Sequence, residues 1–450
     1  MSPLRRLAAL AADAGVRATA TTRIIALIGA PVSIYLVATH VAPRIQGYYF
    51  VAVNVIALAQ LFEIGLATIV VQFASHEWPR LRWGKSGGLD GDPVAVAAVH
   101  AVLRAAVRWY AAAALILLAI AGVGGGLLLG SSYADSARGF TMPWCGFVAL
   151  VALYLLIVPF VAVAEGCGEL VAVQRMRSCQ GVALLAALWT GILTSGPLTA
   201  ALLGAAAQLL VSVAWLLWRH AALLLSPRPV PGNMTDAARA LATGFRKQQL
   251  RSAQLWLALW IAPQLLTPIA LKLHGGDAAG RLGVTFAIAF APLTLAVAWL
   301  HGRYPSFGAL VSEGRTPEFD ALARRAAGEA VVVFVAAAAM LTGAVLLLPL
   351  LLPSVAARVL PLPSLLALLG GGLAALLLQA MAGWLRAFRD DKIAGPIVGG
   401  AVITVLVSGV AAAFGSVLLM TAAFAIASLG IAVPIAAAHF IRVRRERLGD

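Results

Sequence analysis

Apolar segments long enough to cross a lipid bilayer recur along almost the whole chain. A membrane-spanning helix needs about 20 mostly apolar residues, because each residue rises about 1.5 Å and the hydrocarbon core is about 30 Å thick. The sequence carries twelve such segments, near residues 24–42, 48–72, 109–129, 143–165, 179–195, 197–218, 254–272, 283–302, 328–352, 362–385, 393–413 and 415–438. With 62% hydrophobic residues, the chain of 450 residues is predicted to be an all-α polytopic membrane protein.

Positive charges are divided unevenly between alternate connectors. If the N-terminus is cytoplasmic, 28 of the 33 lysine and arginine residues lie on the cytoplasmic side. This asymmetry predicts that both termini are cytoplasmic. It also explains the formal net charge of +15, so we expect membrane lipids as partners and no nucleic acid. The five exceptions are Arg44, Arg138, Lys272, Arg281 and Arg358.

The second of two long polar connectors divides the spans into two equal sets. We predict an N-terminal lobe at 1–218, a cytoplasmic linker at 219–253 that carries an amphipathic helix, and a C-terminal lobe at 254–450. Six spans in each lobe give both lobes the same orientation. This arrangement is typical of a parallel pseudo-two-fold repeat, and Pro31 and Pro263 interrupt the first span of each lobe.

A carboxylate lies near the middle of the predicted second span. An acidic residue at this depth costs about 2.5–3.5 kcal/mol on insertion scales, so Glu63 should face protein or a wet cavity. Gln60 is three residues earlier and shares the same helix face. Two interpretations stay open. In one, Glu63 is a cavity carboxylate that binds a coupling proton or cation or pairs with a basic residue of the substrate site. In the other, it forms a buried structural pair with an arginine, for which Arg23 is the nearest candidate.

Further candidate residues lie where the paired spans begin. Arg17 and Arg23 precede or open the first span, and Arg251 precedes the seventh. Guanidinium groups match phosphate oxygens bidentately, so these residues could bind a diphosphate, although each could also serve topology alone. Gln264 lies between Pro263 and Pro268 and could line a cavity or bond to a neighbouring helix.

The remaining sequence motifs do not indicate a functional site. The run Gly84-Lys85-Ser86 ends like a phosphate-binding loop, but Pro79 occupies the position of the first glycine and no strand is expected before it. The GxxxG pairs at 122 and 126 and at 395 and 399 predict close helix packing. The cysteine and histidine spacings indicate neither a metal site nor a disulfide framework, and we expect no cofactor.

Several stretches resemble a known family. They are Gln60-Leu-Phe-Glu-Ile-Gly-Leu with Val71-Gln-Phe-Ala-Ser-His-Glu-Trp78; Glu165-Gly-Cys-Gly-Glu169 with Arg175-Met-Arg177 and Gln180; and Gln264-Leu-Leu-Thr-Pro268 with Gly280-Arg-Leu-Gly283, Trp299-Leu and Pro305-Ser-Phe-Gly308. The chain resembles the polysaccharide (Wzx-type) flippases of the multidrug/oligosaccharidyl-lipid/polysaccharide exporter superfamily.

This resemblance implies a specific activity. The chain would be a flippase of the bacterial inner membrane, and no enzyme. It would move an undecaprenyl-diphosphate-linked oligosaccharide from the cytoplasmic to the periplasmic leaflet by alternating access. It would act as a monomer beside a polysaccharide polymerase and glycosyltransferases. The family lines its cavity from spans one, two, seven and eight, which places Arg23, Glu63, Arg251 and Gln264 there.

Two other functions compete with this interpretation. A drug or metabolite antiporter of the same superfamily, driven by protons or sodium, would be expected to have an acidic cavity, whereas bases crowd the inner ends of the spans. A membrane polymerase or ligase would be expected to carry a large periplasmic loop, and the longest predicted loop there is about 131–142.

Overall fold

The computed structural model describes most of the chain. The described residues are 14–63, 66–130, 137–225, 235–301, 303–304, 307, 310–311, 313–388 and 393–448. Nearly all of them are helical. Eight described helical stretches are long and apolar enough to cross a membrane by length and composition. The predicted all-α polytopic fold is therefore confirmed.

The chain divides into two compact units, which are described separately below. Unit 1 contains residues 1–41 and 55–249, and unit 2 contains residues 42–54 and 250–450. One of the divisions falls inside helix α3 (Pro43–Glu63), so the first half of this helix packs with the C-terminal part of the chain. The lobe boundaries at 218 and 254 stay a prediction.

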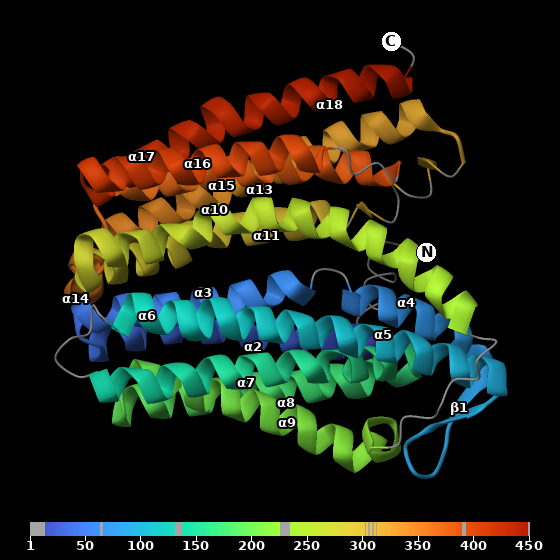
Figure 1. Ribbon diagram of the computed structural model, residues 1–450. Coiled ribbons are helices and arrows are strands. Elements are labelled where there is room, and N and C mark those ends of the chain that lie inside the picture. Colours follow the sequence, from blue (N-terminus) through green and yellow to red (C-terminus); the bar gives the residue numbers. More distant parts are fainter. Residues whose placement is uncertain are drawn as a thin grey trace. The chain divides into compact units, whose positions relative to one another are not determined.

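Unit 1 is a bundle in which α8 packs mainly against α9 and α2, and α7 packs against α9 and α5 (Figure 1). Its elements are α2 (Ala14–His40), α4 (Leu66–Glu77), η1 (Trp78–Arg80), β1 (Leu81–Trp83), β2 (Leu89–Gly91), α5 (Pro93–Leu117), η2 (Leu118–Gly124), α6 (Gly125–Gly130), α7 (Ala137–Ala164), η3 (Glu165–Glu169), α8 (Leu170–Thr194) and α9 (Pro197–Leu225).

A β-hairpin formed by β1 and β2 packs against the break between α7 and α8. Cys167 and Gly168 leave the helical conformation, which frees the carbonyl of Cys167 to accept a hydrogen bond of 2.9 Å from Trp83 Nε1 on β1. The far end of the hairpin contacts α9, where the Ala222 N–H donates to Ser86 O at 3.2 Å. The hairpin therefore fixes the ends of α8 and α9 that lie beside it.

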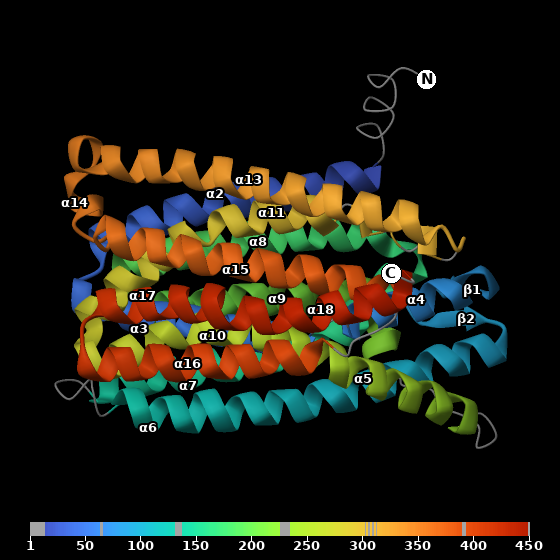
Figure 2. The same cartoon turned by 90° about the horizontal axis from the view of Figure 1, so that it is seen from above.

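Unit 2 also consists of long helices that run side by side, with α16 against α17 and α15 against α17 (Figure 2). Besides the first half of α3, its elements are the main part of α10 (Thr235–Ala289), α11 (Ala291–His301), α13 (Thr316–Leu351), α14 (Pro353–Ala356), α15 (Leu362–Ala387), α16 (Ala394–Phe414), α17 (Val417–Ala427), η5 (Ser428–Ala432) and α18 (Val433–Leu448). A non-helical Gly275 divides α10.

Glycines allow α3 to approach α10 closely within unit 2. A Cβ atom added to Gly47 would lie 2.7 Å from the carbonyl oxygen of Gly276. One added to Gly280 would lie 2.7 Å from the Cβ of Gln46 and 2.8 Å from the Pro43 carbonyl oxygen. Small residues at helix contacts let membrane helices pack through their backbones. These contacts explain why the start of α3 belongs to unit 2.

Three expectations need correction. The prediction of close packing is wrong for Gly126, Gly395 and Gly399, where an added Cβ atom would meet no described atom within 4 Å. At Gly122 an added Cβ atom would lie 3.8 Å from Val148 of α7. The fifth predicted span is longer than expected, since α8 starts at Leu170 and its arginines do not interrupt it. A strand, β1, does precede Gly84, but it pairs with β2 and leads into a hairpin rather than a phosphate-binding helix.

Candidate functional site

Most of the predicted site residues fall outside the part of the chain whose side chains are described. This applies to Arg17, Arg23, Gln60, Glu63 and Arg251. Their backbones belong to the helices α2, α3 and α10. The predicted roles of these five residues are therefore untested.

Gln264 is described, and its backbone is part of a proline kink. Pro268 has no N–H to donate to the carbonyl of Gln264, four residues earlier in α10. The side-chain Nδ2 of Asn54 donates to this carbonyl instead, at 2.8 Å. Both residues belong to unit 2. Asn54 thus replaces the helical hydrogen bond that the proline removes, and it ties α3 to the interrupted part of α10.

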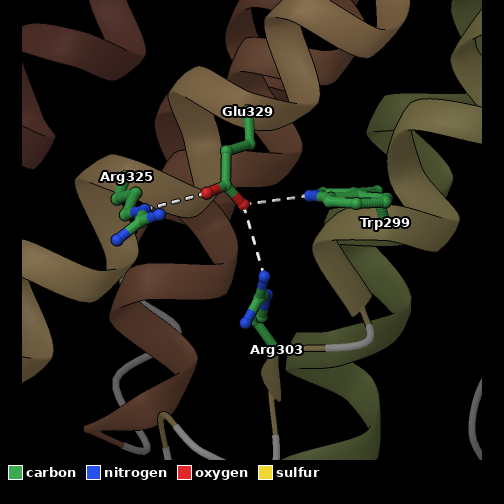
Figure 3. Close-up of polar contacts among 4 residues, drawn as sticks. All are labelled: Trp299, Arg303, Arg325 and Glu329. Carbon is green, nitrogen blue, oxygen red and sulfur yellow. Dashed lines mark hydrogen bonds and ion pairs between the residues drawn. The ribbon is translucent and has the colours of Figure 1, made fainter. Parts of the chain in front are cut away.

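A carboxylate on α13 accepts hydrogen bonds from three side chains (Figure 3). Glu329 Oε1 accepts from Arg325 Nε at 2.9 Å. Its Oε2 accepts from Trp299 Nε1 of α11 at 3.2 Å and from Arg303 Nη2 at 3.4 Å. The arrangement neutralises Glu329 and joins α11 to α13.

A second carboxylate on α13 is more deeply buried. Asp320 is 3% exposed. Arg444 of α18 donates to its two oxygens at 2.8 and 2.7 Å, and Trp384 Nε1 of α15 donates at 3.1 Å. Arg324 completes the group at 3.1 Å. Since a buried carboxylate that loses its partner costs several kcal/mol, this cluster holds the ends of three helices together.

Two more acid–base pairs surround the break between α7 and α8 in unit 1. Arg177 Nη2 donates to Glu165 Oε2 at 2.8 Å. Arg219 of α9 donates to both carboxylate oxygens of Glu169, from Nε at 2.9 Å and from Nη2 at 3.0 Å. A bidentate guanidinium–carboxylate pair fixes the orientation of both side chains. These pairs leave Glu165 and Glu169 without free negative charge.

A tyrosine in the connector after α11 is buried without a hydrogen-bond partner. No described residue bonds to the hydroxyl of Tyr304. Burial raises the pKa of Tyr304, and the charge of Arg386 opposes this effect. The ring packs on Gly383, where an added Cβ atom would collide with it. The hydroxyl therefore stays neutral, and the site contributes packing rather than charge.

Sequence reasoning missed the carboxylates of Asp320 and Glu329. A signal was present, because Arg324 and Arg325 each lie four residues from one of these acids on a single helix. The contacts to Trp384, Arg444 and Trp299 come from distant segments and had no such signal. Among the described residues, no group of three or more histidine, cysteine, aspartate or glutamate side chains could hold a metal ion.

The fold and these sites define a multi-pass helical membrane protein. Its described helices resemble those of solved transporters across nearly the whole chain. One is an inward-facing multidrug resistance MATE family transporter of the MOP superfamily, with a TM-score of 0.61, 14% identity and 94% of each chain covered.

Two further solved structures share this fold. The lipid II flippase MurJ, in an inward closed conformation, gives a TM-score of 0.59 at 10% identity, covering 95% of this chain and 90% of that one. A MATE protein in the straight conformation gives 0.54 at 13% identity, covering 97% and 96%. No family model and no curated protein sequence matches the chain. The likeness is therefore one of fold.

Proposed function

We propose that this protein is a flippase of the bacterial inner membrane. Its substrate is an undecaprenyl-diphosphate-linked oligosaccharide, which it moves from the cytoplasmic to the periplasmic leaflet by alternating access for surface polysaccharide biosynthesis. The fold supports a transport function, since one protein of similar fold is a lipid II flippase and others are MATE transporters. On this proposal both termini are cytoplasmic.

The observation that carries the choice of an anionic substrate is the state of the described carboxylates. Glu165, Glu169, Asp320 and Glu329 are each paired with arginine. A transporter that exchanges organic cations against protons or sodium needs an acidic group that is free to bind them. These four acids do not offer one, although Asp277 is exposed and has no ion pair among the described residues. The pairing of the four buried or half-buried acids supports a substrate that carries phosphate.

Two partly buried arginines of unit 2 support the same choice. Arg281 donates to Val359 O at 3.1 Å, and its Nε has no partner among the described residues. The Nη1 of Arg358 is likewise buried and without a described partner. A buried guanidinium nitrogen that lacks an acceptor favours an anion nearby. On the proposed topology these two arginines lie on the periplasmic side, where the diphosphate would arrive.

The proposed substrate site combines the residues predicted from the sequence. Arg17, Arg23 and Arg251 bind the diphosphate at the cytoplasmic end of the paired spans. Gln60, Glu63 and Gln264 bind sugar hydroxyls or set the charge balance of the cavity. The protein acts as a monomer without a cofactor and catalyses no covalent step. The polymerase and the glycosyltransferases of the same polysaccharide are its functional partners.

A proton- or sodium-coupled multidrug or metabolite antiporter is the second candidate, because MATE transporters share the fold. The two functions differ in what the purified protein retains. We expect mass spectrometry of gently purified protein to detect a polyprenyl-diphosphate sugar. Retention of aromatic cations without such a lipid would favour the antiporter.

Site variants provide a direct test of the proposal. We expect Arg23→Ala and Glu63→Gln each to reduce polysaccharide export at least tenfold at normal protein levels, because one removes the phosphate ligand and the other the charge balance. The matched control is Arg82→Gln, an exposed arginine on β1. Full export with both site variants would remove these residues from the mechanism.

A further inference from the structure

A groove lies between α8 and α9 on the surface of unit 1. Its volume is about 550 Å³. The polar lining comes from Glu169, Arg175 and Arg219, and the aromatic lining comes from Trp215 and Trp218. The groove lies at the end of the two helices where the hairpin contacts α9 and the break between α7 and α8 occurs. On the topology predicted from the sequence this is the cytoplasmic side.

The floor of the groove is apolar and well packed. Met176 and Leu216 belong to a buried core cluster, and Val211 and Trp215 pack against it. The hairpin supports this cluster, because Trp83 also packs on it and contacts the ring of His220 at 4.1 Å between centroids. A floor of this kind is preformed, so a ligand would not have to create it.

The groove carries one uncompensated positive charge. Arg219 and Glu169 neutralise each other in their bidentate pair. Arg175 is exposed and has no hydrogen bond or ion pair with any described residue. It lies on α8 between the apolar lining and the polar end. Trp218 is 80% exposed beside it, and tryptophan is enriched at the level of lipid headgroups.

We propose that this groove binds an anionic phospholipid of the cytoplasmic leaflet. The lipid phosphate pairs with Arg175, and the outer edge of the Arg219–Glu169 pair contacts the polar headgroup. The glycerol and the upper acyl chain lie on Val171, Val211 and Met176. Exposed arginine, aromatic and apolar groups in one groove match the phosphate, the interface and the chain of a single lipid molecule. The argument for this lipid site uses none of the residues of the proposed substrate site.

Two cysteines of the protein allow an internal comparison. Cys179 is exposed and lines the groove, whereas Cys145 is exposed on α7 and does not line it. We would label purified full-length protein in detergent with N-ethylmaleimide and quantify both cysteines by peptide mass spectrometry. Dioleoylphosphatidylglycerol should slow labelling of Cys179 at least threefold relative to Cys145, and dioleoylphosphatidylcholine should not.

The arginine variant decides between lipid binding and non-specific shielding. We expect Arg175→Gln to remove the protection of Cys179 and to lower by one the number of phosphatidylglycerol molecules retained in native mass spectra. Arg82→Gln, which changes the charge equally outside the groove, should change neither readout. Equal protection by both lipids, full retention by Arg175→Gln, or equal protection by inorganic pyrophosphate would overturn the proposal. The native mass spectra decide the outcome if Cys179 does not react.

Discussion

At the scale of single residues, one side chain compensates for a proline. Asn54 donates to the Gln264 carbonyl, whose helical partner Pro268 cannot provide an N–H. The sequence indicated that Gln264 could bond to a neighbouring helix. It did not indicate Asn54 as the partner, because the two residues are 210 positions apart. Only the structure shows that the Asn54 side-chain amide bonds to the backbone at the proline kink of α10.

The first prediction concerns this hydrogen bond. Asn54→Leu keeps a similar size and leaves the Gln264 carbonyl without a donor, which should lower stability by about 1–3 kcal/mol. In a Pro268→Ala background the helix regains its own donor, so the same substitution should cost clearly less. Thermal unfolding of the four proteins in detergent forms the double-mutant cycle. Equal costs in both backgrounds would show that Asn54 does not compensate for Pro268.

At the scale of elements, glycine contacts determine how α3 packs on α10. The second prediction is that Gly280→Ala destabilises unit 2, because the new Cβ atom would lie 2.7 Å from that of Gln46. Overpacking of this kind costs about 1–3 kcal/mol. Gly328→Ala on α13 is the matched control, since an added Cβ atom there meets no described atom within 4 Å. An equal loss of melting temperature in both variants would contradict the proposed packing.

Elements also show what the sequence could and could not predict. The length of the apolar segments predicted the membrane helices, because a helix that crosses the bilayer core needs a long run of apolar residues. It misjudged α8, because Arg175 and Arg177 suggested a connector although arginine is compatible with a helix. It missed the hairpin, whose strands have three residues each and are stabilised by Trp83 against a distant helix break. Such tertiary contacts leave no periodic pattern.

At the scale of the whole molecule, orientation in the membrane is a testable consequence of the charge asymmetry. The third prediction is that Cys145 reacts with a membrane-impermeant thiol reagent added outside intact cells, whereas Cys179 does not. Both side chains are exposed in the structure, while Cys167 is buried and therefore uninformative. Reaction of Cys179 from outside, with Cys145 protected, would reverse the topology.

The site residues predicted from the sequence differ from the charged clusters that the structure shows. The bonds from Trp384 and Arg444 to Asp320, and from Trp299 to Glu329, form only when α11, α13, α15 and α18 are assembled. The proposed substrate residues rest on span position and on family resemblance, and among them the structure describes the side chain of Gln264. Transport measurements therefore test these residues directly.

Translocation in a reconstituted membrane tests the central claim most directly. The substrate is a fluorescent oligosaccharide attached to a polyprenyl diphosphate, placed in proteoliposomes of the purified protein, and its label is quenched from outside. We predict that the protein speeds loss of the inner-leaflet signal at least tenfold over protein-free vesicles, and that Arg23→Ala abolishes the gain. A rate equal to that of protein-free vesicles, with transport of an organic cation in the same preparation, would contradict the account.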